Sequence, residues 1–200
     1  TSSDDADVTL AGLIEVRSGG ITIGNASNSV NNDIEYSGAG YPAIEVSGGT
    51  LFVNGQIRRS LINGLGSLVY NQWGGGVVIN GRNVKPSRAK LEVLNSGSTF
   101  NMSDGTITIV RGASTTFNDL YLRPDIYSVT GGTIIFGNTT TENSTTNVFT
   151  MDSQIPLYNI TVDGTTNAKT VTLSVHGITL QGSLTINGSS VFRADSLDVN

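Results

Sequence analysis

The residues that could carry acid–base chemistry are few in this sequence, and they lie far apart. Asp119 and Asp125 lie on either side of Arg123, and carboxylates beside a basic residue can cleave glycosidic bonds or hold Ca²⁺ near a sugar. His176 is the single histidine, so it is the one candidate base for a nucleophilic triad. Solvated turn charges and a histidine at a strand end are the plainer interpretations, and we prefer them.

A further set of candidate metal ligands lies at the start of the chain. Asp4, Asp5 and Asp7 form an acidic cluster, and carboxylates are the ligands that Ca²⁺ prefers. Terminal residues commonly fray, however. Cysteine is absent, which excludes a thiolate metal site, a disulfide framework and a cysteine nucleophile. We therefore expect no metal or other cofactor, with Ca²⁺ as the open alternative.

Positive charge gathers in the segment 58–90. It holds six of the eleven Lys and Arg residues, and no acidic residue lies between Val46 and Leu91. Arginine and aromatic side chains are enriched at contact sites. We predict that this segment contacts an anionic glycan or the acidic start of a neighbouring subunit, with a solvated loop as the plainer alternative. The candidate residues are Arg58, Arg59, Tyr70, Trp73, Arg82, Lys85, Arg88 and Lys90.

The composition excludes several classes of protein. The net charge of −5 argues against general nucleic-acid binding, and neither a P-loop nor a dinucleotide-binding fingerprint is present. No apolar run is long enough for a transmembrane segment. Only 14% of the residues are charged, while Val, Ile and Thr are abundant, which favours pleated backbone over disorder.

The sequence contains a repeat of about 27 residues, and the structure that this repeat forms must position the candidate functional residues. In each unit a Gly or small polar residue leads into an apolar-x-apolar triplet, and an Asn, Asp or Gly turn follows. The triplets are Ile21–Ile23, Leu51–Val53, Val77–Ile79, Ile107–Ile109, Ile134–Phe136, Ile160–Val162 and Leu184–Ile186. Most repeats hold further strand signals, at 14–16, 44–46, 68–70, 91–93 and 126–129, with a more irregular one at 116–122.

This pattern predicts an all-β fold, a right-handed parallel β-helix of about seven coils with three short strands per coil. Because alternate residues of a strand face opposite sides, the outer residues of each triplet should stack inside the solenoid. The chain should form one domain over 1–200, within a longer repetitive chain, and 54–90 should include an irregular lateral loop. A β-sandwich is the competing fold, but its Asn-Gly turns should join neighbouring antiparallel strands.

The middle residue of each triplet should face outward. Threonine takes this position in four repeats, which resembles the rows of ice-binding solenoids, but larger apolar residues interrupt the row. Two of them, Phe52 and Val78, fall on consecutive coils and are predicted to form an exposed apolar contact. Glu15, Glu45 and Glu92 also occupy equivalent phases in our alignment, so we expect them on one outer face.

Phrases such as Ser47-Gly48-Gly49-Thr50-Leu51, Leu157-Tyr158-Asn159-Ile160-Thr161-Val162 and Gly182-Ser183-Leu184-Thr185-Ile186-Asn187-Gly188 resemble segments of right-handed β-helix surface proteins. Such segments occur in secreted adhesins of Bacteroidota-type bacteria and in autotransporter passengers. The resemblance implies an extracellular or cell-surface location and a structural or adhesive role in a stalk, adhesin or filament, not an enzyme. Partners would be a surface glycan or other subunits of the same assembly. The alternative is a polysaccharide lyase or hydrolase, or a carbohydrate-binding domain, on the same scaffold.

Overall fold

The computed structural model describes residues 7–25, 31–62, 64–82, 87–113, 118–141 and 145–200. In these residues the one helical element is the short 3₁₀ turn η1 (Thr145–Asn147). The strands are β1 (Val8–Leu10), β2 (Leu13–Val16), β3 (Gly20–Ile23), β4 (Ile34–Tyr36), β5 (Ala43–Val46), β6 (Thr50–Val53), β7 (Ile57–Arg59), β8 (Val69–Ile79), β9 (Leu91–Ile109), β10 (Leu120–Val129), β11 (Thr133–Phe136), β12 (Val148–Ser153), β13 (Asn159–Val162), β14 (Thr170–Leu173), β15 (Leu184–Ile186) and β16 (Val191–Arg193).

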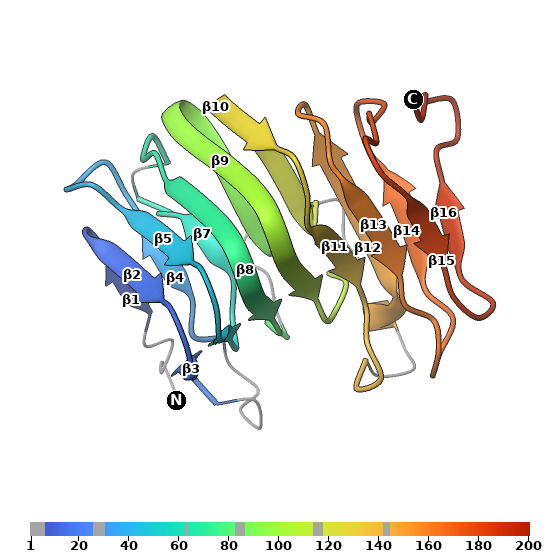
Figure 1. The fold of residues 1–200 in the computed structure, drawn as a ribbon, viewed down its shortest axis with the longest axis horizontal. Helices are drawn as coiled ribbons and strands as arrows, with labels where there is room; N and C mark the ends of the chain where they lie inside the picture. The colour runs from blue at the N-terminus through green and yellow to red at the C-terminus, as the bar shows by residue number, and fades with distance from the viewer. Residues whose placement is uncertain (1–6, 26–30, 63, 83–86, 114–117, 142–144) are drawn as a thin grey trace.

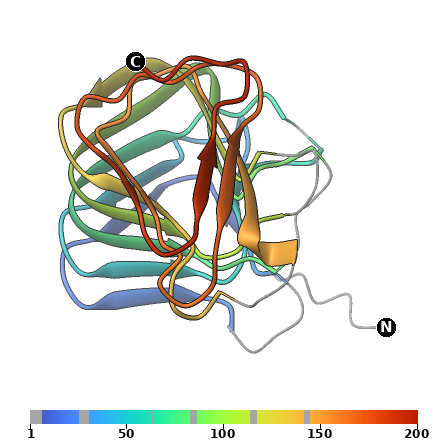
Figure 2. The same ribbon diagram turned by 90° about the vertical axis from the view of Figure 1, so that its right-hand side faces the viewer.

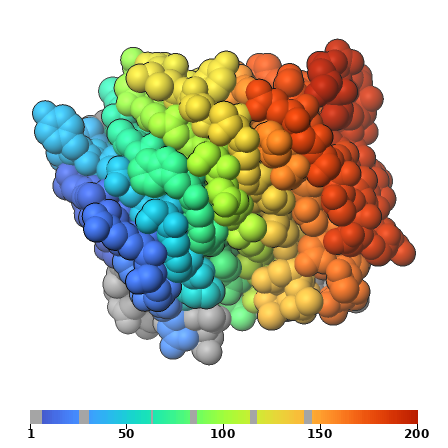
Figure 3. All heavy atoms as spheres, in the orientation of Figure 1, coloured from blue at the N-terminus to red at the C-terminus, as the bar shows by residue number. Residues whose placement is uncertain are grey.

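The strands stack as three parallel ladders, one for each side of a coil (Figures 1 and 2). The first ladder runs β1-β4-β7-β9-β10-β12-β14-β16. The second joins β2, β5 and parts of β8, β9 and β10, and the third runs β3-β6-β8-β9-β11-β13-β15. The seven strands of the third ladder define coils 1 to 7, which make about six turns with a spacing of about 27 residues. The predicted parallel β-solenoid is therefore confirmed, and its coils form oblique bands in Figure 3.

The core follows the predicted triplets. In the third ladder Leu51 pairs with Val77, and Val77 pairs with Ile107, so that identical positions of successive coils lie in line. Their side chains are fully buried. At the last coil, Leu184 and Ile186 remain 36% and 43% exposed, because β15 pairs on one side only. All described pairings of the triplets are parallel, which rules out the β-sandwich.

Glycines line the corner between the second and third ladders. Gly19, Gly49, Gly75, Gly105 and Gly132 all have positive φ values, between 64° and 85°. A Cβ atom on Gly75 would lie 2.5 Å from the carbonyl oxygen of Gly49 on the preceding coil. Glycine is therefore needed here both for its backbone conformation and for the close approach of neighbouring coils.

Two details of the sequence-based strand assignment need correction. The stretch 54–90 is less irregular than expected, because β7 and β8 pair in register with the preceding coil. Glu92 does not share a face with Glu15 and Glu45: the latter two are paired in the second ladder, whereas Glu92 pairs with Tyr121 in the first. The Leu-Glu-Val triplet at 91–93 has the same alternation as a second-ladder strand, so alternation alone could not tell the ladders apart.

Candidate functional site

The predicted basic contact segment does not form one surface. The side chains of Arg58 and Lys90 are buried, and Tyr70 lies in the core, where its ring stacks on Phe100 with centroids 5.1 Å apart. The side chains of successive coils stack in this way because parallel strands lie about 4.8 Å apart. These three residues are therefore wrong as members of a solvent-facing patch.

The remaining candidates are scattered. Trp73 is 48% exposed and Arg82 is also exposed, but the paired strand 76–79 separates them. Lys85 lies outside the described residues. The last two candidates, Arg59 and Arg88, are mostly buried and share a carboxylate partner.

Arg58 is neutralised by acidic residues of the two preceding coils. Its guanidinium contacts Asp33 at 2.6 Å, Glu35 at 2.5 Å and Asp7 at 2.7 Å. Burial raises the pKa of the Asp33 carboxyl, although its hydrogen bond with Arg58 opposes that shift. Asp7 thus binds Arg58 rather than acting as a free metal ligand, and the other two candidate ligands, Asp4 and Asp5, lie outside the described residues.

Glu92 contacts both Arg59 and Arg88. Its Oε1 accepts hydrogen bonds from the backbone N–H and the Nε of Arg59, at 2.7 and 3.0 Å, and lies 3.6 Å from the Nε of Arg88. Glu92 is fully buried. Three arginines of the basic segment are thus paired with carboxylates within the fold, in part from other coils.

The predicted carboxylate pair is not assembled. Asp119 is fully buried, and its Oδ1 has no hydrogen-bond partner in the described part of the chain. Asp125 is exposed and accepts hydrogen bonds from Ser96 Oγ and the Gly97 N–H, at 2.9 and 2.8 Å. Six residues of mostly extended strand place the two aspartates roughly 15–20 Å apart, too far for the two carboxylates of a glycosidase.

Asp119 and Lys90 form a buried electrostatic pair on the first ladder. Burial raises the pKa of the Asp119 carboxyl to about 7, because the charged form loses its hydration. Burial likewise lowers the pKa of the Lys90 ammonium to about 8, and the charge of Asp119 opposes this effect. Lys90 Nζ also donates a hydrogen bond to the carbonyl of Gly81. Arg123, the third member of the predicted set, is exposed and lies over the ring of Tyr121.

A hollow not foreseen from the sequence opens where the coils change size. Eleven residues lead from Leu122 in the first ladder to Thr133 in the third ladder, on coil 5. On coil 6 only six residues lead from Ser153 to Asn159, which occupy the matching positions. Coil 6 therefore passes from the first to the third ladder without forming a second-ladder strand. In the described residues, the edge of Ile126–Val129 that faces coil 6 has no strand partner.

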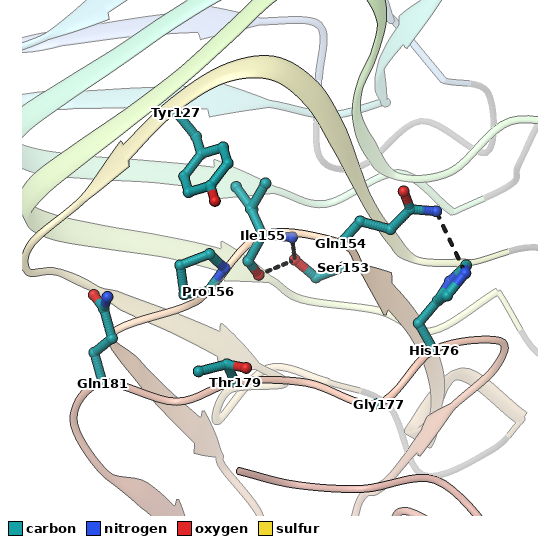
Figure 4. A pocket seen from close by; sticks show the side chains of 9 residues that line it. All are labelled: Tyr127, Ser153, Gln154, Ile155, Pro156, His176, Gly177, Thr179 and Gln181. Carbon is teal, nitrogen blue, oxygen red and sulfur yellow. Dashed lines mark hydrogen bonds between the residues drawn. The ribbon is translucent and has the colours of Figure 1, made fainter.

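This hollow, which we call the corner pocket, has a volume of about 670 Å³. Figure 4 shows the ring of Tyr127 above the turn that holds Ile155 and Pro156, with Gln181, Thr179 and His176 along the other side. The lining residues come from coils 5, 6 and 7: Tyr127, Ser153, Gln154, Ile155, Pro156, His176, Gly177, Thr179 and Gln181.

Asp152 holds His176 in place at the edge of this pocket. The imidazole Nδ1 lies 2.9 Å from Oδ1 of Asp152, which also accepts the backbone N–H of His176 at 3.2 Å. Asp152 is buried, while the His176 side chain is 47% exposed. The second ring nitrogen, Nε2, lies 3.5 Å from Nε2 of Gln154 (Figure 4). His176 is therefore the turn-adjacent residue that the sequence predicted, but it has a specific partner.

No family model, curated protein or solved structure matches this chain. The site must therefore be interpreted from its own geometry. Within the described residues, no group of three or more His, Cys, Asp or Glu side chains could hold a metal ion. No helix there is long and apolar enough to cross a membrane.

The predicted apolar contact lies at a second hollow, on the outer face of the third ladder. Phe52 pairs in register with Val78, and the Phe52 side chain is 41% exposed. Both line a pocket of about 710 Å³ whose rim includes Asn54 and Asn80. Asn80 donates a hydrogen bond to Asn54, and its own oxygen accepts one from Arg111 Nε at 2.9 Å. The two apolar residues lie together as predicted, while their role in contacts remains a prediction.

The residues of the corner pocket escaped the sequence reasoning for a simple reason. Asp152 and His176 are 24 residues apart, close to one repeat, and they therefore meet on successive coils. That spacing was the available signal. Only residues one repeat apart meet in this way, so the local sequence around His176 does not indicate Asp152.

Proposed function

We propose that this chain is an extracellular structural and adhesive module, a segment of the shaft of a cell-surface stalk, adhesin or filament. The observation that carries the proposal is the continuous parallel register of the third ladder from β3 to β15. A solenoid of this kind gains about 4.8 Å in length per coil, and each coil is stabilised by its neighbours. It is thus suited to hold a binding surface at a distance.

Exposed apolar side chains support the adhesive part of the proposal. Tyr41, Ile62 and Leu65 lie where coils 2 and 3 pass from the first to the second ladder, and Tyr127 lies in the second ladder on coil 5. Ile62 and Tyr41 are 99% and 91% exposed. Large exposed apolar residues commonly mark sites of contact with other molecules.

Labelling of intact cells tests the proposed location. An antibody raised against this chain is expected to label intact cells of the source organism, or its culture medium, without permeabilisation. Labelling that requires permeabilisation would overturn the extracellular proposal. A cytosolic marker protein, probed in the same cells, controls for lysis.

A second candidate function is polysaccharide binding or cleavage, and the corner pocket favours it. A screen of acidic and neutral polysaccharides, with product detection, separates binding from turnover. We expect binding without turnover. Turnover that disappears in Asp152→Ala or His176→Ala, with folding intact, would replace the structural proposal by an enzymatic one.

A further inference from the structure

We propose that the corner pocket binds an uncharged saccharide, an inference that rests on the proposed adhesive function and names the ligand class of that function. The pocket lies on coils 5 to 7, away from the basic segment predicted as the contact site. Its volume of about 670 Å³ falls in the range of small-ligand sites.

The step between coils 5 and 6 leaves polar backbone accessible at the pocket. Hydrogen bonds join the two coils before the step, from the Gln154 N–H to Leu122 at 2.9 Å, and after it, from the Asn159 N–H to Gly132 at 3.2 Å. Between these points, and among the residues that the structure describes, Ile126–Val129 pairs only with coil 4. Peptide groups at an unpaired strand edge are available to hydroxyl groups of a ligand.

The side chains of the pocket point to a ligand that is polar and uncharged. None of the nine lining residues is Asp, Glu, Lys or Arg. Gln154 and Gln181 each offer a carboxamide that both donates and accepts hydrogen bonds, and Thr179 offers a hydroxyl. A sugar hydroxyl has the same dual character. An anionic ligand would find no lysine or arginine in this lining, and an apolar one would leave the amides unpaired.

Tyr127 supplies the apolar surface that a sugar ring requires. Its side chain is 50% exposed and faces the pocket beside Ile155 and Pro156 (Figure 4). The C–H face of a pyranose packs well on an aromatic face, and the phenolic hydroxyl remains able to bond. An aromatic platform edged by amides therefore matches both faces of a saccharide.

The pocket is also preorganised, which reduces the entropy lost on binding. The hydroxyl of Ser153 donates to the Ile155 carbonyl at 2.8 Å and accepts from the Ile155 N–H at 3.4 Å, which fixes the turn at the floor. Asp152 fixes the imidazole of His176 through Nδ1. With Nδ1 donating to the carboxylate, the neutral ring presents Nε2 as an acceptor.

An extended peptide is the other occupant that an open strand edge admits. Here the free edge is short, and a register irregularity lies between Pro124 and Ile126. Such bulges discourage the addition of a strand. The opposite wall presents the side chains of Thr179 and Gln181, which favours a ligand with many hydroxyl groups.

The test is isothermal titration of the full chain with a panel of uncharged tetrasaccharides built from glucose, mannose or galactose. At least one should bind, and Tyr127→Ala and Gln181→Ala should each weaken its binding about tenfold or more, since truncating a central contact of an interface costs at least this much. Tyr127→Phe should keep most of the affinity, because it keeps the ring. Leu13→Ala, which removes an exposed apolar side chain on coil 1, outside the pocket, is the control and should bind like the wild type.

Other outcomes overturn the inference. They are the absence of binding by the whole panel at millimolar concentration, binding that survives both alanine substitutions, and preferential binding of an acidic tetrasaccharide or of an extended peptide. Thermal melts of each variant check folding, and the exposed positions of Tyr127 and Gln181 make large losses of stability unexpected. Labelling of intact cells does not depend on this pocket, so failure of this inference is distinguishable from failure of the proposed location and shaft role.

Discussion

Asp152 and His176 lie on successive coils, with the carboxylate Oδ1 2.9 Å from the imidazole Nδ1. An ionised carboxylate accepts hydrogen bonds but cannot donate them. The buried Asp152 therefore selects the ring tautomer that carries the proton on Nδ1. The same carboxylate oxygen accepts the His176 backbone N–H, which fixes the turn as well as the ring.

This contact can be measured directly, because His176 is the only histidine. In ¹⁵N NMR spectra at pH 8 we expect Nδ1 of the wild-type imidazole to be protonated and Nε2 to be unprotonated. In Asp152→Ala the preference for the proton on Nδ1 should be lost, because the carboxylate that selects this tautomer is gone. Identical imidazole spectra for the two proteins would contradict the assigned hydrogen bond.

Arg58 is expected to be essential for stability. In Arg58→Met the buried Asp33 loses its cation, and removing one partner of a buried ion pair costs about 3–5 kcal/mol. Chemical denaturation should detect this loss, and Asp33→Asn in the same chain should recover part of it. Arg17→Met breaks an exposed pair with Glu15 and should leave the midpoint unchanged. Equal losses for both arginines would contradict the buried network.

Asp119 and Asp125 should affect stability with opposite dependence on pH. Folding raises the pKa of the Asp119 carboxyl to about 7. The protonated carboxyl therefore makes its full contribution to the free energy of unfolding below about pH 4, and this contribution is lost as the pH rises to 7. The wild type should therefore lose unfolding free energy relative to Asp119→Asn over that range, on the order of a few kcal/mol.

For Asp125 the sign reverses. Hydrogen bonds from the Gly97 N–H and the Ser96 hydroxyl lower the pKa of its carboxyl. Its contribution is present above the ordinary pKa of an aspartate, about 3.9, and is lost as the pH falls. Asp125→Asn should have a lower free energy of unfolding than the wild type at neutral pH, and this difference should shrink as the pH is lowered. Urea denaturation at several pH values measures it. Parallel pH profiles for the two variants would show that one environment is misassigned.

The strand phase of the third ladder can be tested with adjacent residues. Ile107 is fully buried between Val77 and Ile134, so Ile107→Asp places an unpaired charge in the core and should cost about 4 kcal/mol or more. Thr108 faces outward, and Thr108→Asp should cost about 1 kcal/mol or less. Similar losses of melting temperature for Ile107→Asp and Thr108→Asp would contradict the assigned alternation of inward and outward residues in this strand.

The third ladder was predictable because its triplets recur at one spacing with one alternation, and Leu51, Val77 and Ile107 illustrate this. The first ladder was harder. Its outward residues include Arg58 and Glu92, which are buried although they lie on the outer face of a strand. Their partners come from other coils or from connecting segments, so neither the local sequence nor the two-residue period revealed that they are covered.

The corner pocket was unpredictable for a related reason. It arises from a difference in length between two consecutive coils, and not from a motif in either of them. Tyr127 and Gln181 lie 54 positions apart in the sequence, and nothing local to either residue indicates the other. What connects them is the number of residues between Ser153 and Asn159, which becomes informative only when the register of the ladders is known.

The varying length of the passage from the first to the third ladder has a consequence for how such a molecule diversifies. The passage takes 17 residues from Arg59 to Gly76 and six from Ser153 to Asn159, yet the third ladder keeps its register throughout. The fold therefore accommodates passages of very different length between these two ladders. Each change in length reshapes the surface beside its coil, so that selection can create or erase recognition sites one coil at a time on an unchanged scaffold.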